Sequence, residues 1–227
     1  MIRSAKSTIT STVTRTQLST IYTASSTSTH TSVIVVPTPT SYPGMNYYVY
    51  PNTYNYLTSN PGFNATTFNS PKYNESGVVD DVNLEHTYNY PSSDNSCHLP
   101  GNYYGPCGQV TIVNQGYFHA AESGSYTFAT NSTMDNAMYV WSGDVAYDSY
   151  TNSNWDYSAT RQGYPVVETP GNKTYTLTAG ELMPMTIMFV NGGGPGRAVI
   201  SVTNPDGVTN GTSGYFLPPC DDTTFSP

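Results

Sequence analysis

The sequence has few charged residues: Asp, Glu, Lys and Arg make up 10% of its 227 residues, and only seven are Lys or Arg, against 15 Asp or Glu. The formal net charge is −8. No cationic cluster could neutralise a run of phosphates, which excludes a nucleic-acid surface. The polar surface must therefore come mainly from Ser, Thr, Asn and Gly rather than from Lys and Glu.

Long apolar runs are also missing. No stretch approaches the roughly 18 apolar residues of a membrane span, and the N-terminal residues lack the apolar segment of a signal peptide. We therefore expect neither membrane insertion nor an export signal within this sequence. Five Asn-x-Ser/Thr sequons nevertheless suit the secretory pathway, and they predict a glycosylated piece of a longer secreted protein at Asn64, Asn74, Asn131, Asn172 and Asn210.

Cysteine is scarce, with three residues, which allow one disulfide and leave one thiol over. We expect Cys220 to pair with either Cys97 or Cys107. Such a long loop would stabilise the fold by about 4 to 5 kcal/mol in the chain-entropy model. A zinc site is the weaker alternative, because no C-x-x-C or H-x-x-x-H spacing accompanies the Cys97-His98 pair.

Composition changes abruptly near Pro43. Residues 1–41 hold 21 Ser or Thr and no acidic residue, and such a segment cannot bury enough apolar surface to fold alone. We predict a Ser/Thr-rich stalk or linker over 1–41, a folded domain over 42–222 and a polar tail over 223–227. Three of the seven basic residues lie in the stalk, so the remainder carries four against 15 acids, a net −11.

The folded part has strand signals and little helical periodicity. Short runs rich in Val, Ile, Tyr, Phe and Thr are separated by Gly, Pro and Asn, which predicts an all-β fold, an antiparallel β-sandwich or barrel with long loops. The apolar run 183–190 is expected to be a central strand covered on both faces. Residues 50–105 are expected to form long loops or insertions. The predicted strands are 45–50, 110–120, 125–130, 137–141, 174–178, 185–190 and 198–203.

Two polar loops follow or precede these strands. An Asp-Asn pair, Asp135-Asn136, directly precedes the strand that ends at Trp141. An apolar strand later in the chain breaks into Asn191-Gly-Gly-Gly194. These blocks, together with Gly44-Met-Asn-Tyr47, Gly124-Ser-Tyr-Thr-Phe128 and Trp141-Ser-Gly-Asp144, occur in the order seen in a known family. The sequence resembles the GLEYA adhesin domain, a protective-antigen-like lectin fold related to yeast flocculins and epithelial adhesins.

The resemblance implies a calcium site. In that family two adjacent acidic residues and a later Asn hold Ca²⁺, which binds vicinal hydroxyls of a terminal sugar; by position these are Asp135, Asn136 and Asn191 here. The sequence departs from the family at Asn136, where Asp is usual. An amide oxygen still suits Ca²⁺, but the site loses one negative charge, so weaker binding or an altered sugar preference is expected. Backbone carbonyls could come from Gly192, Gly193 and Gly194, because glycine lets the chain approach a ligand closely.

A second loop, 147–157, resembles the family's variable sugar-contacting loop. An aromatic ring there could stack on a pyranose while neighbouring polar groups bond its hydroxyls. The candidates are Tyr150, Trp155, Asp156 and Tyr157, and Trp155 leads, whereas Trp141 is expected in the core. Two other acidic pairs, Asp80-Asp81 and Asp221-Asp222, are expected to be solvated loop charges, because no strong strand pattern flanks them.

The function predicted from these features is calcium-dependent binding of terminal sugars on cell-surface or cell-wall glycans. We expect a non-enzymatic, monomeric adhesin module, extracellular and multivalent through display in many copies. One alternative is a structural wall domain whose site is degenerate at Asn136. A glycoside hydrolase is less expected, because it needs two carboxyl groups across one bond, and no such pair stands out.

Overall fold

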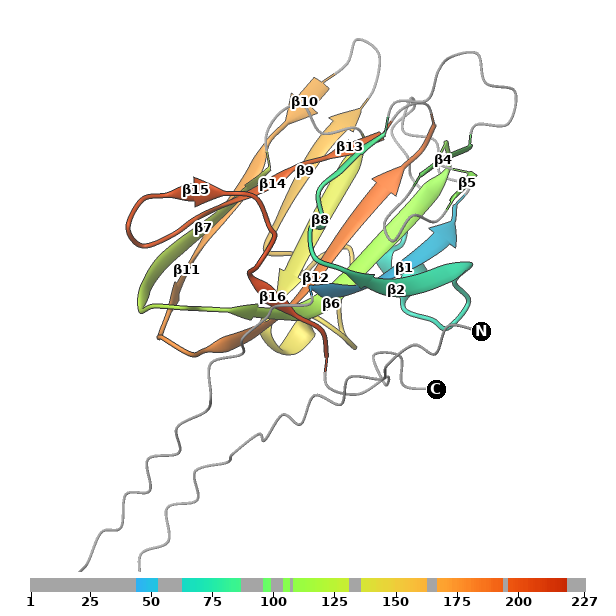
Figure 1. Ribbon diagram of the computed structural model, residues 1–227. Helices are drawn as coiled ribbons and strands as arrows, with labels where there is room; N and C mark the ends of the chain where they lie inside the picture. Colours follow the sequence, from blue (N-terminus) through green and yellow to red (C-terminus); the bar gives the residue numbers. More distant parts are fainter. Residues whose placement is uncertain are drawn as a thin grey trace, which may run out of the picture. The chain divides into compact units, whose positions relative to one another are not determined.

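The computed structural model describes residues 44–52, 63–86, 96–98, 104–106, 108–130, 136–162, 167–193 and 196–219. All of them belong to one of the chain's two units, residues 40–227. Two antiparallel sheets face each other in this unit (Figure 1). No helix among the described residues is long and apolar enough to cross a membrane. The predicted stalk, 1–41, and tail, 223–227, lie outside the described residues.

The larger sheet has eight strands in the order β10-β9-β8-β12-β6-β1-β2, with β16 also paired to β6. Its centre is the ten-residue ladder between β6 and β12, which runs from Leu182 opposite His119 to Asn191 opposite Val110. The bounds are β1 Met45–Pro51, β2 Glu75–Val79, β6 Val110–His119, β8 Ala137–Ser142, β9 Tyr157–Gln162, β10 Val167–Thr169, β12 Leu182–Asn191 and β16 Phe216–Leu217.

The smaller sheet has four strands in the order β11-β7-β14-β15. Two further strand pairs, β13 with β3 and β4 with β5, lie apart from both sheets. Two 3₁₀ helices, η1 and η3, lie among the described residues. Their bounds are β7 Gly124–Thr130, β11 Gly171–Leu177, β14 Ile200–Thr203, β15 Thr209–Asn210, β3 Leu84–His86, β13 Gly196–Ala198, β4 Ser96–His98, β5 Tyr104–Pro106, η1 Ala65–Phe68 and η3 Gly143–Val145.

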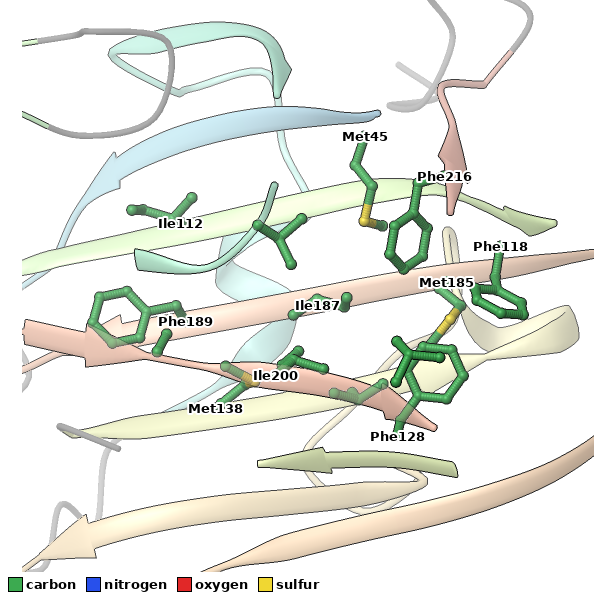
Figure 2. Packing of buried hydrophobic residues seen from close by; sticks show 14 of the residues in the cluster. Met45, Ile112, Phe118, Phe128, Met138, Met185, Ile187, Phe189, Ile200 and Phe216 are labelled. Atoms are coloured by element: carbon green, nitrogen blue, oxygen red, sulfur yellow. The ribbon is translucent and has the colours of Figure 1, made fainter. Parts of the chain in front are cut away.

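The main core fills the space between the sheets. Phe128 and Ile200 come from the smaller sheet and pack against side chains of the larger one, among them Met185, Ile187 and Phe189 (Figure 2). Alternate residues of each strand face this layer, as expected for antiparallel strands packed on one face. The burial of these side chains is the dominant stabilising term of the fold.

A second apolar cluster covers the opposite face of the larger sheet. It is rich in aromatic rings and includes Trp141, Tyr139 and Tyr150, with η1 and its Phe68 packed against them. Strand β12 contributes to both clusters, with Phe189 in one and its neighbours Met188 and Val190 in the other. The prediction that 183–190 is a central strand covered on both faces is confirmed.

Each of the seven predicted segments contains a strand, although 198–203 is divided between β13 and β14, and the antiparallel sandwich is confirmed. The structure adds strands within 50–105, where loops were expected, and at 157–162, for which no strand was predicted. Strand β2 extends the larger sheet beyond β1, and β9 pairs with β8. Their sequences, Glu-Ser-Gly-Val-Val and Tyr-Ser-Ala-Thr-Arg-Gln, are too polar to predict strands. Strand β2 lies at an edge of the sheet, whereas β9 lies between β8 and β10.

Gly44, one of the residues that carry the resemblance, is required by geometry. Its φ is +104°, in the region that favours glycine. A Cβ there would lie 1.8 Å from the Val79 carbonyl oxygen. Its amide donates to the Phe216 carbonyl at 3.1 Å. Gly44 therefore lets β1 begin in close contact with both β2 and the C-terminal segment.

The Asp80-Asp81 pair is exposed, as expected, but it also holds the C-terminal segment of the domain. Asp80 Oδ1 accepts from the Gly214 amide at 3.0 Å, and its other oxygen bonds the Ser213 hydroxyl. Asp81 Oδ1 accepts from the hydroxyl of buried Thr212, which itself accepts from the Val82 amide at 3.1 Å. The pair is therefore solvated, and it also bonds residues 212–214. Asp221-Asp222 lies outside the described residues.

We expect Thr212→Val to lower the free energy of unfolding by about 1 to 3 kcal/mol, because the Val82 amide loses a buried acceptor while the side-chain shape is kept. Urea unfolding of unglycosylated protein measures this. Thr209→Val is the control: its hydroxyl bonds Thr203 on the exposed surface, so its effect should stay within about 0.5 kcal/mol. Equal effects would contradict the assigned role of Thr212.

Candidate functional site

Four neighbouring strands of the larger sheet have ends at one edge. Pro51 at the end of β1 is opposite Val110 at the start of β6, and Val110 is opposite Asn191 at the end of β12. Ala137 at the start of β8 is opposite Val190. The antiparallel register therefore collects the residues that follow or precede these ends, and they include Asn52, Asn136 and Asn191.

The structure brings two of the predicted metal ligands together. Asn136 and Asn191 are 7% and 0% exposed. The amide of Gly192 donates to Asn136 Oδ1 at 2.7 Å, so segments 56 residues apart in the sequence meet directly. The Asn136 carbonyl accepts from the Arg161 amide of β9 at 2.6 Å. Asn136 is thus fixed by β9 on its backbone and by the 191–193 segment on its side chain.

The glycine loop begins with a turn built by Asn191. Its Oδ1 accepts from the Gly193 amide at 3.2 Å. Gly193 has φ +145°, a conformation that L side chains rarely adopt. The glycine at this position is therefore a backbone requirement of the turn. Gly194 lies outside the described residues, and its expected role stays a prediction.

Asn52, which the sequence reasoning did not select, also reaches this edge. Its Nδ2 donates to the Asn191 carbonyl and to Thr111 Oγ1, both at 3.1 Å. Its backbone amide donates to the Gln109 carbonyl at 3.2 Å. Its place directly after the first predicted strand could have drawn attention to it. The sequence does not show, however, that this strand end lies beside Asn191, because that depends on how the strands pair.

The donor chemistry of this edge suits a hard cation. Carboxylate, amide and backbone carbonyl oxygens are the ligands that Ca²⁺ takes, and the two described candidates supply side-chain amides. Among the described residues no group of three His, Cys, Asp or Glu could hold a metal. Asp135 lies outside the described residues but directly precedes Asn136 in the chain. A calcium site here would therefore combine the Asp135 carboxylate with Asn136, Asn191 and loop carbonyls.

Strands β9 and β10 carry an ion pair between Arg161 and Glu168. Arg161 Nε lies 3.4 Å from Glu168 Oε1, and both side chains are partly exposed. An exposed pair of this kind contributes little stability. It does place a compensating carboxylate beside the guanidinium of the residue whose amide holds Asn136.

The predicted sugar loop is not a uniformly open surface. Tyr150 is 1% exposed, and its ring packs 5.0 Å from that of Trp141. Tyr157 is 6% exposed and belongs to the core between the sheets. Burial raises the pKa of both phenols well above the ordinary value. Neither ring offers a face to a sugar, so the expectation for these two is corrected: they pack the interior.

Trp155, unlike Tyr150 and Tyr157, is exposed, and its predicted stacking role stays a prediction. Its side chain is 38% exposed, and its ring lies 5.2 Å from Tyr139, which stacks on Phe63 at 4.9 Å. Asn152 holds this region by accepting from the Ala65 amide at 2.7 Å and donating to the Phe63 carbonyl. The aromatic neighbours brace the indole, which reduces the entropy lost when a ligand stacks on it.

Trp155 contacts β8 at Tyr139 rather than at the Asn136 end of the strand. Tyr139, which supports Trp155, lies three residues along the chain from Asn136, about 10 Å at the rise of a strand. Asp156, between Trp155 and β9, donates its amide to the Val140 carbonyl at 2.8 Å. Its Oδ2 is buried, and its carboxyl group interacts with the Tyr175 hydroxyl. Asp156 therefore turns one carboxylate oxygen inward rather than toward a ligand.

Solved structures that this fold resembles include adhesin A domains in complex with sugars and a PA14 domain. The A domain of epithelial adhesin 9 from Candida glabrata, solved with Galβ1-4GlcNAc, has a TM-score of 0.61 at 15% identity over 80% of this chain and 92% of that domain. The A domain of epithelial adhesin 6, with Galβ1-3GlcNAc, has a TM-score of 0.56 at 18% identity, over 80% and 89%. The PA14 domain of the antifreeze protein MpAFP gives 0.52 at 12%, over 85% and 100%. The fold is thus the protective-antigen-like β-sandwich of these adhesin domains.

Within that class, residues 110–204 match the model of the GLEYA domain, which confirms the resemblance, although the matched segment does not include Gly44 and Tyr47. A cell agglutination protein of Schizosaccharomyces pombe is 26% identical over 200 residues, 77% of this chain and 16% of its own length. The flocculation protein FLO9 of Saccharomyces cerevisiae is 34% identical over 125 residues, 50% of this chain and 9% of its own length. The chain thus spans under a fifth of either relative.

Four of the five sequon asparagines are described, and their side chains are exposed: Asn64, Asn74, Asn172 and Asn210. Exposure is what an attached glycan requires, and glycosylation stays a prediction. Asn131 lies outside the described residues. So do Cys107 and Cys220, while Cys97 is described by its place in β4 alone, and the expected disulfide therefore also stays a prediction.

We expect Tyr150→Phe to leave the free energy of unfolding unchanged or to raise it by about 1 kcal/mol, because its hydroxyl is buried with no partner among the described residues. Tyr50→Phe, in contrast, removes a 2.7 Å bond to the Ser70 carbonyl and should lower it by about 1 kcal/mol. Urea unfolding compares the two. A loss of glycan binding in Tyr150→Phe would contradict its placement in the core.

Proposed function

We propose that this domain is a calcium-dependent carbohydrate-binding module of a cell-surface adhesin. The observation that carries the proposal is the meeting of Asn136 with the Asn191–Gly193 turn at one edge of the sheet. The likeness to sugar-complexed adhesin domains and the match to the GLEYA domain support it. Agglutination and flocculation proteins among the relatives support a role in adhesion.

The metal ligands would be Asp135, Asn136 and Asn191, with carbonyls of the loop from Gly192 to Gly194. When bound, calcium supplies a hard cation to which two vicinal sugar hydroxyls can bind. The protein contributes a preformed loop: the Gly192 and Gly193 amides are already bonded to Asn136 and Asn191. A ligand therefore need not order this backbone on binding, which lowers the entropic cost of association.

Trp155 would serve a second sugar rather than the one held at the metal. Tyr139, against which the indole packs, lies about 10 Å along the strand from Asn136. An exposed indole braced by Tyr139 and Phe63 offers one flat apolar face to the next sugar of a chain. We infer that the ligand is at least a disaccharide, with its terminal sugar at the metal.

We infer binding rather than catalysis. The described residues of the site contribute amides, which cannot exchange protons as the paired carboxyl groups of a glycoside hydrolase do. The partners would be terminal sugars of glycans on a cell surface or cell wall, outside the cell. Individual contacts would be weak, and a monomeric domain displayed in many copies would gain strength through multivalency.

The proposal predicts glycan binding that requires both calcium and Asp135. On a glycan array with millimolar calcium chloride, the protein should bind terminal sugars, and chelator should abolish the signal. Asp135→Ala should abolish it in calcium while the protein stays folded, because the site then loses its carboxylate. Trp155→Ala should weaken binding about tenfold, the scale of one lost stacking contact, yet remain calcium-dependent.

The controls decide between mechanisms. Circular dichroism of Asp135→Ala should match that of the unmodified protein, so that a loss of signal reports the site alone. Binding that persists in chelator would refute the metal mechanism. Full activity of Asp135→Ala would remove the assignment of the site.

The alternative, a structural wall domain with a degenerate site, rests on Asn136. We expect Asn136→Asp to bind calcium more tightly, on the order of tenfold, because a carboxylate adds ligand charge while still accepting from the Gly192 amide. Calcium should also raise the melting temperature of the unmodified protein, since a ligand that binds only the folded state stabilises it. No shift for the unmodified protein, with a shift restored by Asn136→Asp, would favour the degenerate-site alternative.

A further inference from the structure

One peptide group of the candidate site is held from both sides. The carbonyl of Asn191 and the amide of Gly192 belong to the same planar unit. Asn52 Nδ2 donates to that carbonyl at 3.1 Å, and Asn136 Oδ1 accepts from that amide at 2.7 Å. Two side-chain amides, from the ends of β1 and β8, therefore fix the orientation of a single peptide plane at the end of β12.

The Asn52 side of this arrangement is buried, and its Nδ2 group has two hydrogen-bond acceptors. Asn52 is 8% exposed, and Thr111, which accepts its second bond at 3.1 Å, is 0% exposed. Thr111 lies on β6, between β1 and β12 in the sheet, so the Asn52 side chain crosses one strand to reach the next. An amide with two donors is the group that can bond a hydroxyl and a carbonyl at once.

The need for such a clamp follows from the residues after it. Glycine loses more conformational freedom on ordering than any other residue, and residues 192 to 194 are all glycine. Fixing the plane between Asn191 and Gly192 sets the last torsion of Asn191 and the first of Gly192. This fixed peptide plane helps to hold the turn in which the Gly193 amide donates to Asn191 Oδ1 at 3.2 Å.

We propose that Asn52 is a positioning residue for the metal-binding loop: it holds the Asn191–Gly192 peptide in the orientation that binds the cation. The inference rests on the proposed function and assigns a role to a residue outside the segment that matches the GLEYA domain, 110–204. The role rests on the Nδ2 group of Asn52, which donates to the Asn191 carbonyl and to Thr111 Oγ1.

The test measures calcium alone, with calcium chloride titrated calorimetrically into Asn52→Ala and into the nearly isosteric Asn52→Leu. Both lack the donor to the Asn191 carbonyl, and we expect the calcium Kd to rise by about tenfold or more, the usual effect of losing a group that orients a metal ligand. The Leu variant keeps the packing volume, so it remains informative if the Ala variant folds poorly.

Asn114 provides a matched control. It is a buried Asn, 3% exposed, whose Nδ2 also donates to a carbonyl of β12, that of Ile187 at 3.3 Å. Ile187 lies four residues from Asn191, about 13 Å along the strand. Asn114→Ala and Asn114→Leu should change the calcium Kd by less than about twofold, because distant sites act independently.

A second readout needs no metal. In chelator, amide exchange of Gly192 followed by NMR should accelerate by about tenfold in the Asn52 variants relative to the Asn114 variants, because the clamp is lost locally. Unchanged calcium Kd in the Asn52 variants, or an equal loss in the Asn114 variants, would overturn the inference. If the unmodified protein binds no calcium, the proposed function fails, and unchanged Gly192 exchange would then show separately that Asn52 positions nothing.

Discussion

The ladder between β6 and β12 is the constraint on which the rest of this structure depends. Its ten residue pairs run the full length of both strands, and they set the register of β1 on one side and of β8 on the other. A slip of one residue would turn Phe189 and Val190 to opposite faces and expose both apolar clusters. Because both faces of β12 are buried, the register is strongly specified, and so is the place where each neighbouring strand ends.

The candidate site follows from that register. Asn52, Asn136 and Asn191 are far apart in the chain, and each lies at or next to a strand end, where backbone hydrogen bonding of the sheet stops. Side-chain amides then satisfy the backbone groups that the ladder leaves over: the Asn191 carbonyl, the Gly192 amide and the Gly193 amide. The interactions that complete the sheet edge are thus the same ones that order a glycine loop for a ligand.

Burial of the aromatic residues could be predicted from the sequence in part only. Trp141 was expected in the core and is 0% exposed, because its strand reads as apolar on the face that it shares with Tyr139. Tyr150 and Tyr157 were expected to contact a sugar because their segment resembles a sugar-contacting loop, yet both are buried. Tyr157 begins strand β9, and Tyr150 packs against Trp141, a partner that composition does not reveal. The pairing of β8 with β9 buries Tyr157, whereas Trp155, two residues earlier, stays at the surface.

The sequence by itself determined the strand content, the central position of residues 183–190, the acidic and cation-poor surface, and the two polar segments at strand ends. These depend on local composition and alternation, which act over a few residues. The tertiary structure decided which strand ends share an edge, that Asn52 reaches Asn191, and that Asp80 and Asp81 hold residues 212–214. These three hydrogen bonds join residues 131 to 139 positions apart, and their formation depends on the packing of the whole sheet.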